Sequence, residues 1–123
     1  MGVLQKDVID RCGVANDGKA VLTMYCEGQL GKDFTMDDVG EKAETYLEFV
    51  LSGQLAEQVP ASKGRPAVIR ISCEYWPHSK YKENFRKMAS QLAAYEVGLL
   101  VDVSSLRAGG GIFDFSADGL TGV

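Results

Sequence analysis

The sequence contains few of the side chains that build metal centres and hydrolytic sites. Its 123 residues include one histidine, His78, and three cysteines. The cysteines lie far apart and form no C-x-x-C motif, so we expect buried thiols, with a disulfide or reactive thiol as the alternative, and no zinc site. A hydrolytic triad needs partners for its histidine, and the sequence identifies none for His78. The phosphate-binding motif G-x-x-x-x-G-K-S/T is absent as well. These absences predict no cofactor, no metal and no enzymatic activity.

Long apolar runs and an excess of positive charge are also missing. No apolar run approaches the ~20 residues that a membrane helix needs, and residues 1–7 contain no hydrophobic segment after a basic start. We therefore expect a cytoplasmic protein without membrane contact. The 13 Lys and Arg residues against 17 Asp and Glu give a net charge of -4. That charge disfavours a general nucleic-acid binder and slightly favours a basic partner.

The composition is that of a globular domain with a separate tail. With 46% hydrophobic and 24% charged residues, the chain can bury a core, and its length corresponds to one domain. We place a single α+β domain at residues 1–108 and a Gly-rich tail at residues 109–123, because three consecutive glycines from Gly109 are incompatible with regular structure. Residues 112–115 alternate like a short strand. They form an extra edge strand, exchange with a second copy in a homodimer, or stay disordered until a partner binds.

Hydrophobic periodicity and turn signals predict five elements before the tail. Asp17-Gly18 is a tight-turn signal between two short strands, and Thr35 is a candidate N-cap for the first helix. The remaining boundaries follow from apolar spacing, and the elements are a hairpin at 7–26, a helix at 36–51, a strand at 66–75, a helix at 80–94 and a strand at 97–103. The second helix is long enough to make its flanking strands parallel. The expected fold is a two-layer α+β sandwich of ββαβαβ order, with two helices on one face of a mixed four-stranded sheet.

The third strand predicts two unlike sheet faces. Ala67, Ile69, Ile71, Cys73 and Tyr75 should face the core, while the alternate residues Val68, Arg70, Ser72 and Glu74 face the other way. Arg70 and Glu74 are expected to bridge each other or a neighbouring strand. A half-exposed sheet face is the plain interpretation, and it is also where a binding surface would lie. On the first helix, Glu41, Lys42, Glu44 and Glu48 are predicted to be solvated.

The most unusual local composition follows this strand. Tyr75, Trp76, His78 and Tyr81 cluster around Pro77, and Trp and Tyr dominate interface hot spots. We predict these four as candidate partner-binding residues. The structural alternative is a chain hinge in which Ser79 or His78 caps the second helix.

A local basic cluster opens the second helix. The cations Lys80, Lys82, Arg86 and Lys87 are candidate anion-binding residues in an otherwise acidic chain. The alternative is a solvated helix face in which Glu83 supports Lys87 four residues later.

Several motifs resemble a family of small bacterial proteins of unknown function. They are residues 7–10, the hairpin at 16–23, the helix segment 46–49 followed by Ser52-Gly53, the Lys63-Gly64 turn, and the strand that ends in an aromatic residue and Pro77. The resemblance covers residues 5–103. It implies the ββαβαβ order and a bacterial source, and it implies no activity and no site residue.

The function expected from these observations is non-catalytic protein binding, as in a small inhibitor, an immunity-like protein or an adaptor. An acidic surface would steer association with a basic partner. The alternatives are an anion- or nucleic-acid-binding module that uses the second helix, and an enzyme with an unrecognised carboxylate site. Homodimerisation through the edge strand or the tail is a further expectation.

Overall fold

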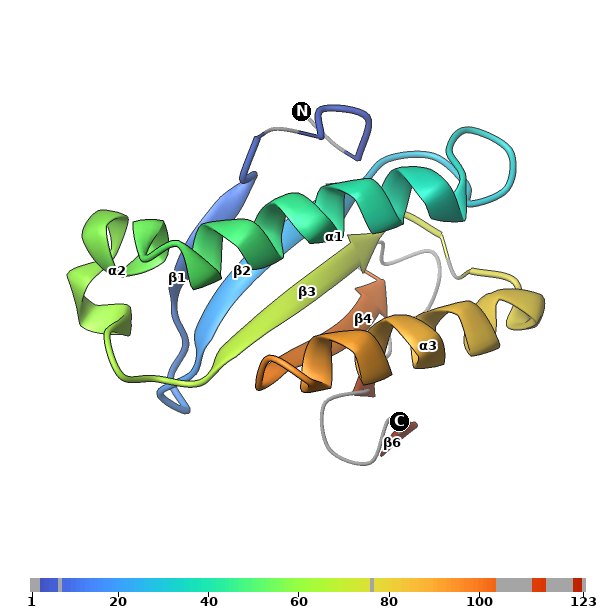
Figure 1. The fold of residues 1–123 in the computed structure, drawn as a ribbon. Coiled ribbons are helices and arrows are strands. Elements are labelled where there is room, and N and C mark those ends of the chain that lie inside the picture. The colour runs from blue at the N-terminus through green and yellow to red at the C-terminus, as the bar shows by residue number, and fades with distance from the viewer. Residues whose placement is uncertain (1–2, 7, 76, 104–111, 115–120, 123) are drawn as a thin grey trace.

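The computed structural model describes residues 3–6, 8–75, 77–103, 112–114 and 121–122. Within them the chain forms an α+β fold of ββαβαβ order, as predicted (Figure 1). Its elements are β1 (Arg11–Val14), β2 (Ala20–Cys26), α1 (Met36–Leu51), α2 (Gln54–Gln58), η1 (Pro60–Ser62), β3 (Ala67–Cys73), η2 (Ser79–Tyr81), α3 (Lys82–Ala93), β4 (Val97–Val103), β5 (Ile112–Asp114) and β6 (Thr121–Gly122).

The sheet is mixed, and its strands follow one another in chain order from β1 to β6. β1 pairs antiparallel with β2, whereas β2, β3 and β4 run parallel. The predicted parallel pairing of β3 with β4 is therefore confirmed. β5 adds antiparallel to the other side of β4, with Leu100 opposite Asp114. Of the three alternatives for the tail, the structure shows an added strand, β5, and the two-residue strand β6 pairs antiparallel with its outer side.

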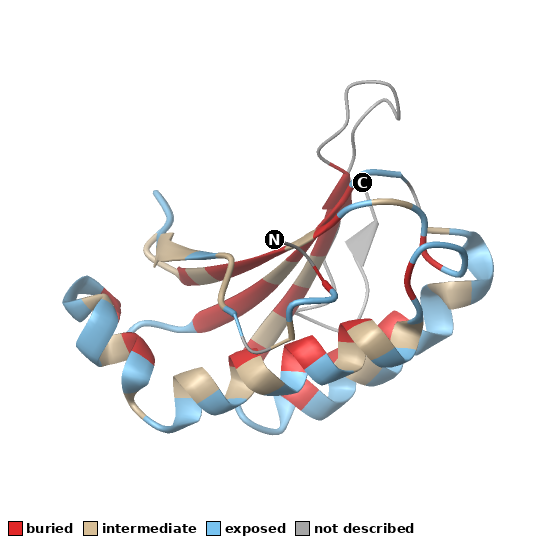
Figure 2. Cartoon of the chain, turned by 90° about the horizontal axis from the view of Figure 1, so that it is seen from above, coloured by how far each residue is buried: buried red, intermediate tan, exposed pale blue. Residues whose placement is uncertain are grey.

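Both long helices cover the same face of the sheet (Figures 1 and 2). Beneath them, alternate residues of the three parallel strands are almost completely buried, as the two-layer prediction requires; Leu22, Met24, Ile69, Ile71, Leu99 and Val101 are each at most 2% exposed. Tyr75, which we predicted to face this core, is 43% exposed. The prediction is wrong because β3 ends at Cys73, so the alternation no longer applies two residues later.

The boundaries of α1 are those predicted, and local chemistry explains them. Thr35 accepts a hydrogen bond from the N–H of Asp38, and the Asp38 carboxylate accepts one from the N–H of Thr35. This capping box satisfies two amides at the helix start. At the other end Gly53 has a φ of +88°, a conformation that glycine adopts without steric cost. No helix in the described part of the chain is long and apolar enough to cross a membrane.

Lys42 is completely buried, which corrects the prediction that it is solvated. Its Nζ lies 2.8 Å from Oδ1 of Asp10 and 3.0 Å from the carbonyl oxygen of Gln5. The prediction failed because it followed the charge of the side chain, although Lys42 stands three residues after Val39 and four before Tyr46, on the stripe that α1 buries. Here the segment that leads into β1 covers Lys42.

Asp10 also fixes the start of the sheet. Its Oδ2 accepts a hydrogen bond from the N–H of Tyr25, and its own N–H donates to the hydroxyl of Tyr46. That hydroxyl in turn donates to the carbonyl oxygen of Thr23. Burial raises the pKa of Tyr46 above its ordinary value, so the phenol stays protonated. One carboxylate therefore joins the N-terminal segment, α1 and β2.

Two of the three cysteines are neighbours in the core. Cys26 and Cys73 occupy paired positions of β2 and β3 and are thiols that form no disulfide with each other. A hydrogen bond with Cys73, together with burial, raises the pKa of Cys26. Both side chains are buried as predicted, while Cys12 is half-buried.

Candidate functional site

The face of the sheet that the helices leave uncovered carries two rows of polar side chains. Strand register places Arg11, Thr23 and Arg70 opposite one another on β1, β2 and β3. Two residues further along, Tyr25, Ser72 and Asp102 form the next row on β2, β3 and β4. No helix in the described part of the chain lies over this side (Figure 2). We call these residues the polar face; its members are Arg11, Thr23, Tyr25, Arg70, Ser72 and Asp102.

An ion pair joins the two rows diagonally. Nε of Arg70 donates to Oδ2 of Asp102 at 2.6 Å, and Nη2 contacts the same oxygen. The Asp102 side chain is 7% exposed and that of Arg70 is 42% exposed. We predicted that Arg70 and Glu74 bridge each other or a neighbouring strand. Arg70 does bridge to a neighbouring strand, whereas Glu74 accepts a hydrogen bond from the N–H of Gly28. Oδ1 of Asp102 is buried and has no hydrogen-bond partner among the described residues.

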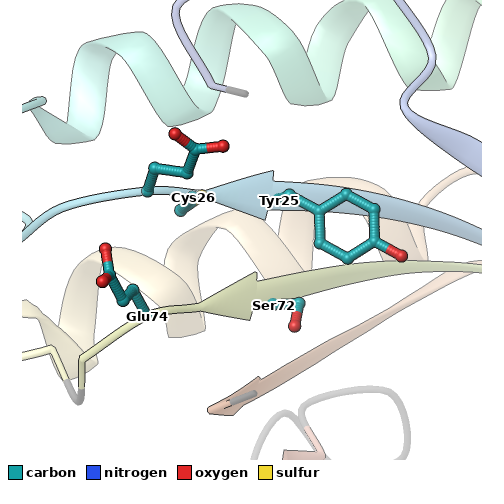
Figure 3. A pocket seen from close by; sticks show the side chains of 5 residues that line it. Tyr25, Cys26, Ser72 and Glu74 are labelled. Carbon is teal, nitrogen blue, oxygen red and sulfur yellow. The ribbon is translucent and has the colours of Figure 1, made fainter. Parts of the chain in front are cut away.

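A hollow of about 310 Å³ opens at the carboxyl ends of β2 and β3. Figure 3 shows Tyr25 and Ser72 on the two adjacent strands and Glu74 just beyond the end of β3. Glu27 contributes a second carboxylate to the wall. We call this the acidic hollow; it is lined by Tyr25, Cys26, Glu27, Ser72 and Glu74.

A second hollow, of about 230 Å³, lies one row away, over β1 and β2. Arg11 and Arg70 supply its two charged groups, and Thr23 lies between them in the register. We call this the cationic hollow; it is lined by Arg11, Gly13, Val14, Ala15, Val21, Thr23 and Arg70.

The predicted partner-binding residues follow β3 in the sequence, and none of those that the structure describes lines the acidic hollow. Tyr75 is exposed, while Tyr81 is partly buried against the core. Nδ1 of His78 accepts the N–H of Lys80 at 3.0 Å, so His78 caps the short helix η2 that precedes α3, and not α3 itself as the structural alternative stated. Trp76 lies outside the described residues. An interface role for these residues stays a prediction.

The predicted anion-binding residues lie on η2, which contains Lys80, and on α3, which contains the other three. Arg86 forms an ion pair with Glu83, which the sequence analysis had paired with Lys87 instead. Nζ of Lys80 lies 5.2 Å from the ring centre of Tyr81. Lys82 and Lys87 are exposed. An anion-binding role for these four residues stays a prediction.

The hydroxyl of Tyr81 lies close to Gly31 in the loop that follows β2, and this contact can be tested by mutation. Gly31 has a φ of +91°, and a Cβ there would lie 2.2 Å from Oη of Tyr81. Replacing Gly31 by alanine is expected to lower the free energy of unfolding by about 1–3 kcal/mol, because it combines backbone strain with a clash. Urea denaturation followed by circular dichroism measures the change.

A matched control is Gly40→Ala, because a Cβ at Gly40 in α1 meets no atom within 4 Å. Alanine there should stabilise the protein, since it is the better helix former. In the Gly31→Ala background, Tyr81→Phe should restore only the part of the loss due to the clash. Wild-type stability of Gly31→Ala alone would contradict this description of the loop.

Four members of the polar face were missed from the sequence. Arg11, Thr23, Tyr25 and Asp102 each stand at alternate positions of apolar strands, and this alternation was the available signal. Alternation shows which residues share a face of one strand, but it does not show which residues of other strands lie beside them. Register supplies that second fact, and it became known only with the fold.

The comparisons with known proteins give a family and no activity. Residues 1–105 match the model of DUF6572, a family of unknown function, and the chain belongs to that family. No curated protein and no solved structure matches the chain. Among the described residues, no group of three or more His, Cys, Asp or Glu side chains is placed to hold a metal ion. The predicted resemblance to a family of unknown function is confirmed.

Proposed function

We propose that this member of DUF6572 is a non-catalytic protein-binding module whose partner docks on the polar face. One observation carries the proposal. Two hollows of opposite charge, both open to solvent, lie on consecutive rows of the same strands, one lined by Arg11 and Arg70 and the other by Glu27 and Glu74.

The shape of this surface favours a macromolecular partner over a small molecule. Small-molecule sites usually enclose most of their ligand in a single pocket with apolar walls. The polar face instead offers two shallow openings that a partner could contact together. Tyr and Arg, which Tyr25, Arg11 and Arg70 supply here, are also enriched at protein interfaces. Adjacent charges of opposite sign would further select the orientation in which a partner docks.

The net charge of the chain affects how fast a partner protein is encountered more than how tightly it is held in the complex. A charge of -4 favours encounter with a basic partner by long-range attraction. Recognition after encounter depends on the local pattern of charges, because screening limits each charge to a range of about 8–10 Å. An inhibitor or adaptor role is compatible with both steps.

Position-dependent photo-cross-linking tests the proposal. A benzoyl-phenylalanine in place of Tyr25 should cross-link one discrete protein in lysate of cells that naturally express this chain. The same group in place of Leu51, which is 55% exposed on α1, should not capture that protein. With the captured protein purified, Tyr25→Ala should weaken binding about tenfold or more, as expected for an interface tyrosine.

The matched control is Leu51→Ala, which should leave the affinity for the captured protein unchanged. Equal cross-linking from both positions would show that the polar face is not a specific surface. Specific capture from Leu51 alone would place the interface on the helical layer and overturn the proposal.

A further inference from the structure

We propose that the cationic hollow is a carboxylate-binding subsite, which takes an aspartate or glutamate side chain of the partner protein. The inference rests on the proposed function, because it names the chemistry by which the polar face recognises that partner. The proposed subsite consists of residues around Thr23, and it includes none of the four candidate partner-binding residues that follow β3.

Strand register brings two guanidinium groups to one opening. Neighbouring strands lie about 4.8 Å apart, so the Cα atoms of Arg11 and Arg70 are about 10 Å apart on either side of Thr23. Both side chains line the same hollow of about 230 Å³. Arginine side chains are long enough to reach a common anion across this gap, with the Thr23 hydroxyl beneath it as a further donor.

The ion pair with Asp102 positions Arg70 for this role. Asp102 contacts Nε and Nη2, which form one edge of the planar guanidinium. Nη1 therefore lies away from Asp102 and is geometrically suited to a second acceptor. Because the Asp102 carboxylate is buried, it holds the guanidinium in one orientation while the arginine itself stays partly exposed. A preorganised fork loses less entropy on binding an anion than a mobile one.

The local charge matches a carboxylate. Arg11 and Arg70 contribute two positive charges and Asp102 one negative charge, so the site has one net positive charge. A single carboxylate neutralises it and offers two oxygens to guanidinium forks, the geometry in which arginine binds carboxylates best. A phosphate dianion would remain half uncompensated on a chain that is already acidic.

Gly13 provides a variant that closes the hollow without straining the fold. Gly13 lines the opening, and a Cβ there would meet no atom within 4 Å. Its φ is not in the left-handed region, and valine is favoured in strands. Gly13→Val should therefore fold normally, with a melting temperature no lower than that of the wild-type protein, and should occupy the space that the carboxylate needs.

The test is a titration followed by ¹H–¹⁵N NMR of the full chain. The probe is the blocked tripeptide acetyl-Gly-Glu-Gly-amide, its control is the matching Gln peptide, and inorganic phosphate is a third arm. The Glu peptide should shift the amide signals of Thr23 and Arg70 saturably, and the Gln peptide should not. Gly13→Val and Arg11→Gln should each weaken the Glu-peptide affinity about tenfold or more, whereas Lys87→Gln, which removes the same charge from α3, should leave it unchanged.

Several results would overturn the inference. Equal responses to the Glu and Gln peptides would remove carboxylate recognition. Saturable binding of phosphate without binding of the Glu peptide would identify a phosphate site instead. Shifts of the same amides that depend only on protein concentration would show that a second copy of this chain occupies the hollow.

The proposed function and this subsite can fail separately. If Tyr25 cross-links a partner but Gly13→Val binds that partner with unchanged affinity, the polar face is an interface and the cationic hollow is not its carboxylate site. If the Glu peptide binds the hollow as described but Tyr25 captures no protein, the subsite stands and the protein-binding function falls.

Discussion

Replacing Lys42 by alanine is expected to lower the free energy of unfolding by about 3–5 kcal/mol, because it leaves the buried Asp10 carboxylate without its counter-charge. Both side chains are completely shielded from solvent, and the ammonium also binds the carbonyl oxygen of Gln5. A loss of this size is a large fraction of the stability of a domain of this length. Urea denaturation of the wild-type and variant proteins measures it.

The matched control for this variant is Lys87→Ala, which removes the same side chain from an exposed position of α3 and should change stability by less than about 0.5 kcal/mol. Asp10→Ala should be strongly destabilising by itself but should add less in the Lys42→Ala background, where the ion pair is already absent and the main remaining loss is the hydrogen bond from the N–H of Tyr25. Additive losses in the double variant would show that the ion pair is not formed.

Replacing Ile71 by alanine is expected to cost about 2–5 kcal/mol, since it removes three buried carbon atoms and leaves a cavity. Ile71 is 0% exposed and lies between Met24 and Val101 in the register of β3 with its two parallel neighbours. The position therefore reports on the placement of β3 at the centre of the sheet, under the helices. Thermal and urea denaturation measure the loss.

Two further variants provide reference values for the stability loss expected of Ile71→Ala. Ile71→Val removes one methyl group and should cost about 0.5–1.5 kcal/mol. Leu51→Ala removes as many carbon atoms as Ile71→Ala, but from a side chain that is 55% exposed, and should have little effect. Similar losses for Ile71→Ala and Leu51→Ala would contradict the observed packing.

The elements of this fold were predictable from the sequence because their signals are local. The Asp17-Gly18 turn, the Thr35 cap and Gly53 after the helix each act within a few residues; they correctly placed the turn of the hairpin and both ends of α1, whereas β1 begins at Arg11 and not at the predicted residue 7. The parallel pairing of β3 with β4 then followed from the length of the helix between them, whereas that of β2 with β3 was not predicted. The short helix α2 was missed, because five residues carry too little periodicity to distinguish a helix from a loop.

The candidate site was predictable only in part, for a reason that Arg70 illustrates. Alternation along β3 correctly placed Arg70 on the face away from the core and predicted a bridge to a neighbouring strand. It did not name Asp102, which is 32 residues away in the chain and lies in an otherwise apolar strand. Lys42 failed in the same way, since its partner Asp10 is also 32 residues distant. Pairings of this kind depend on the whole fold.

The parallel pairing of β2 with β3 has a consequence for synthesis of the chain. During translation the hairpin and α1 emerge from the ribosome first, but the open edge of β2 has no partner until residues 67–73 have followed. Unpaired strand edges are templates for association with other chains. The nascent hairpin must therefore wait, with its apolar face only partly covered, while residues 27–73 are added at roughly 5–20 residues per second. Protection during this interval depends on how soon α1 can pack over β2.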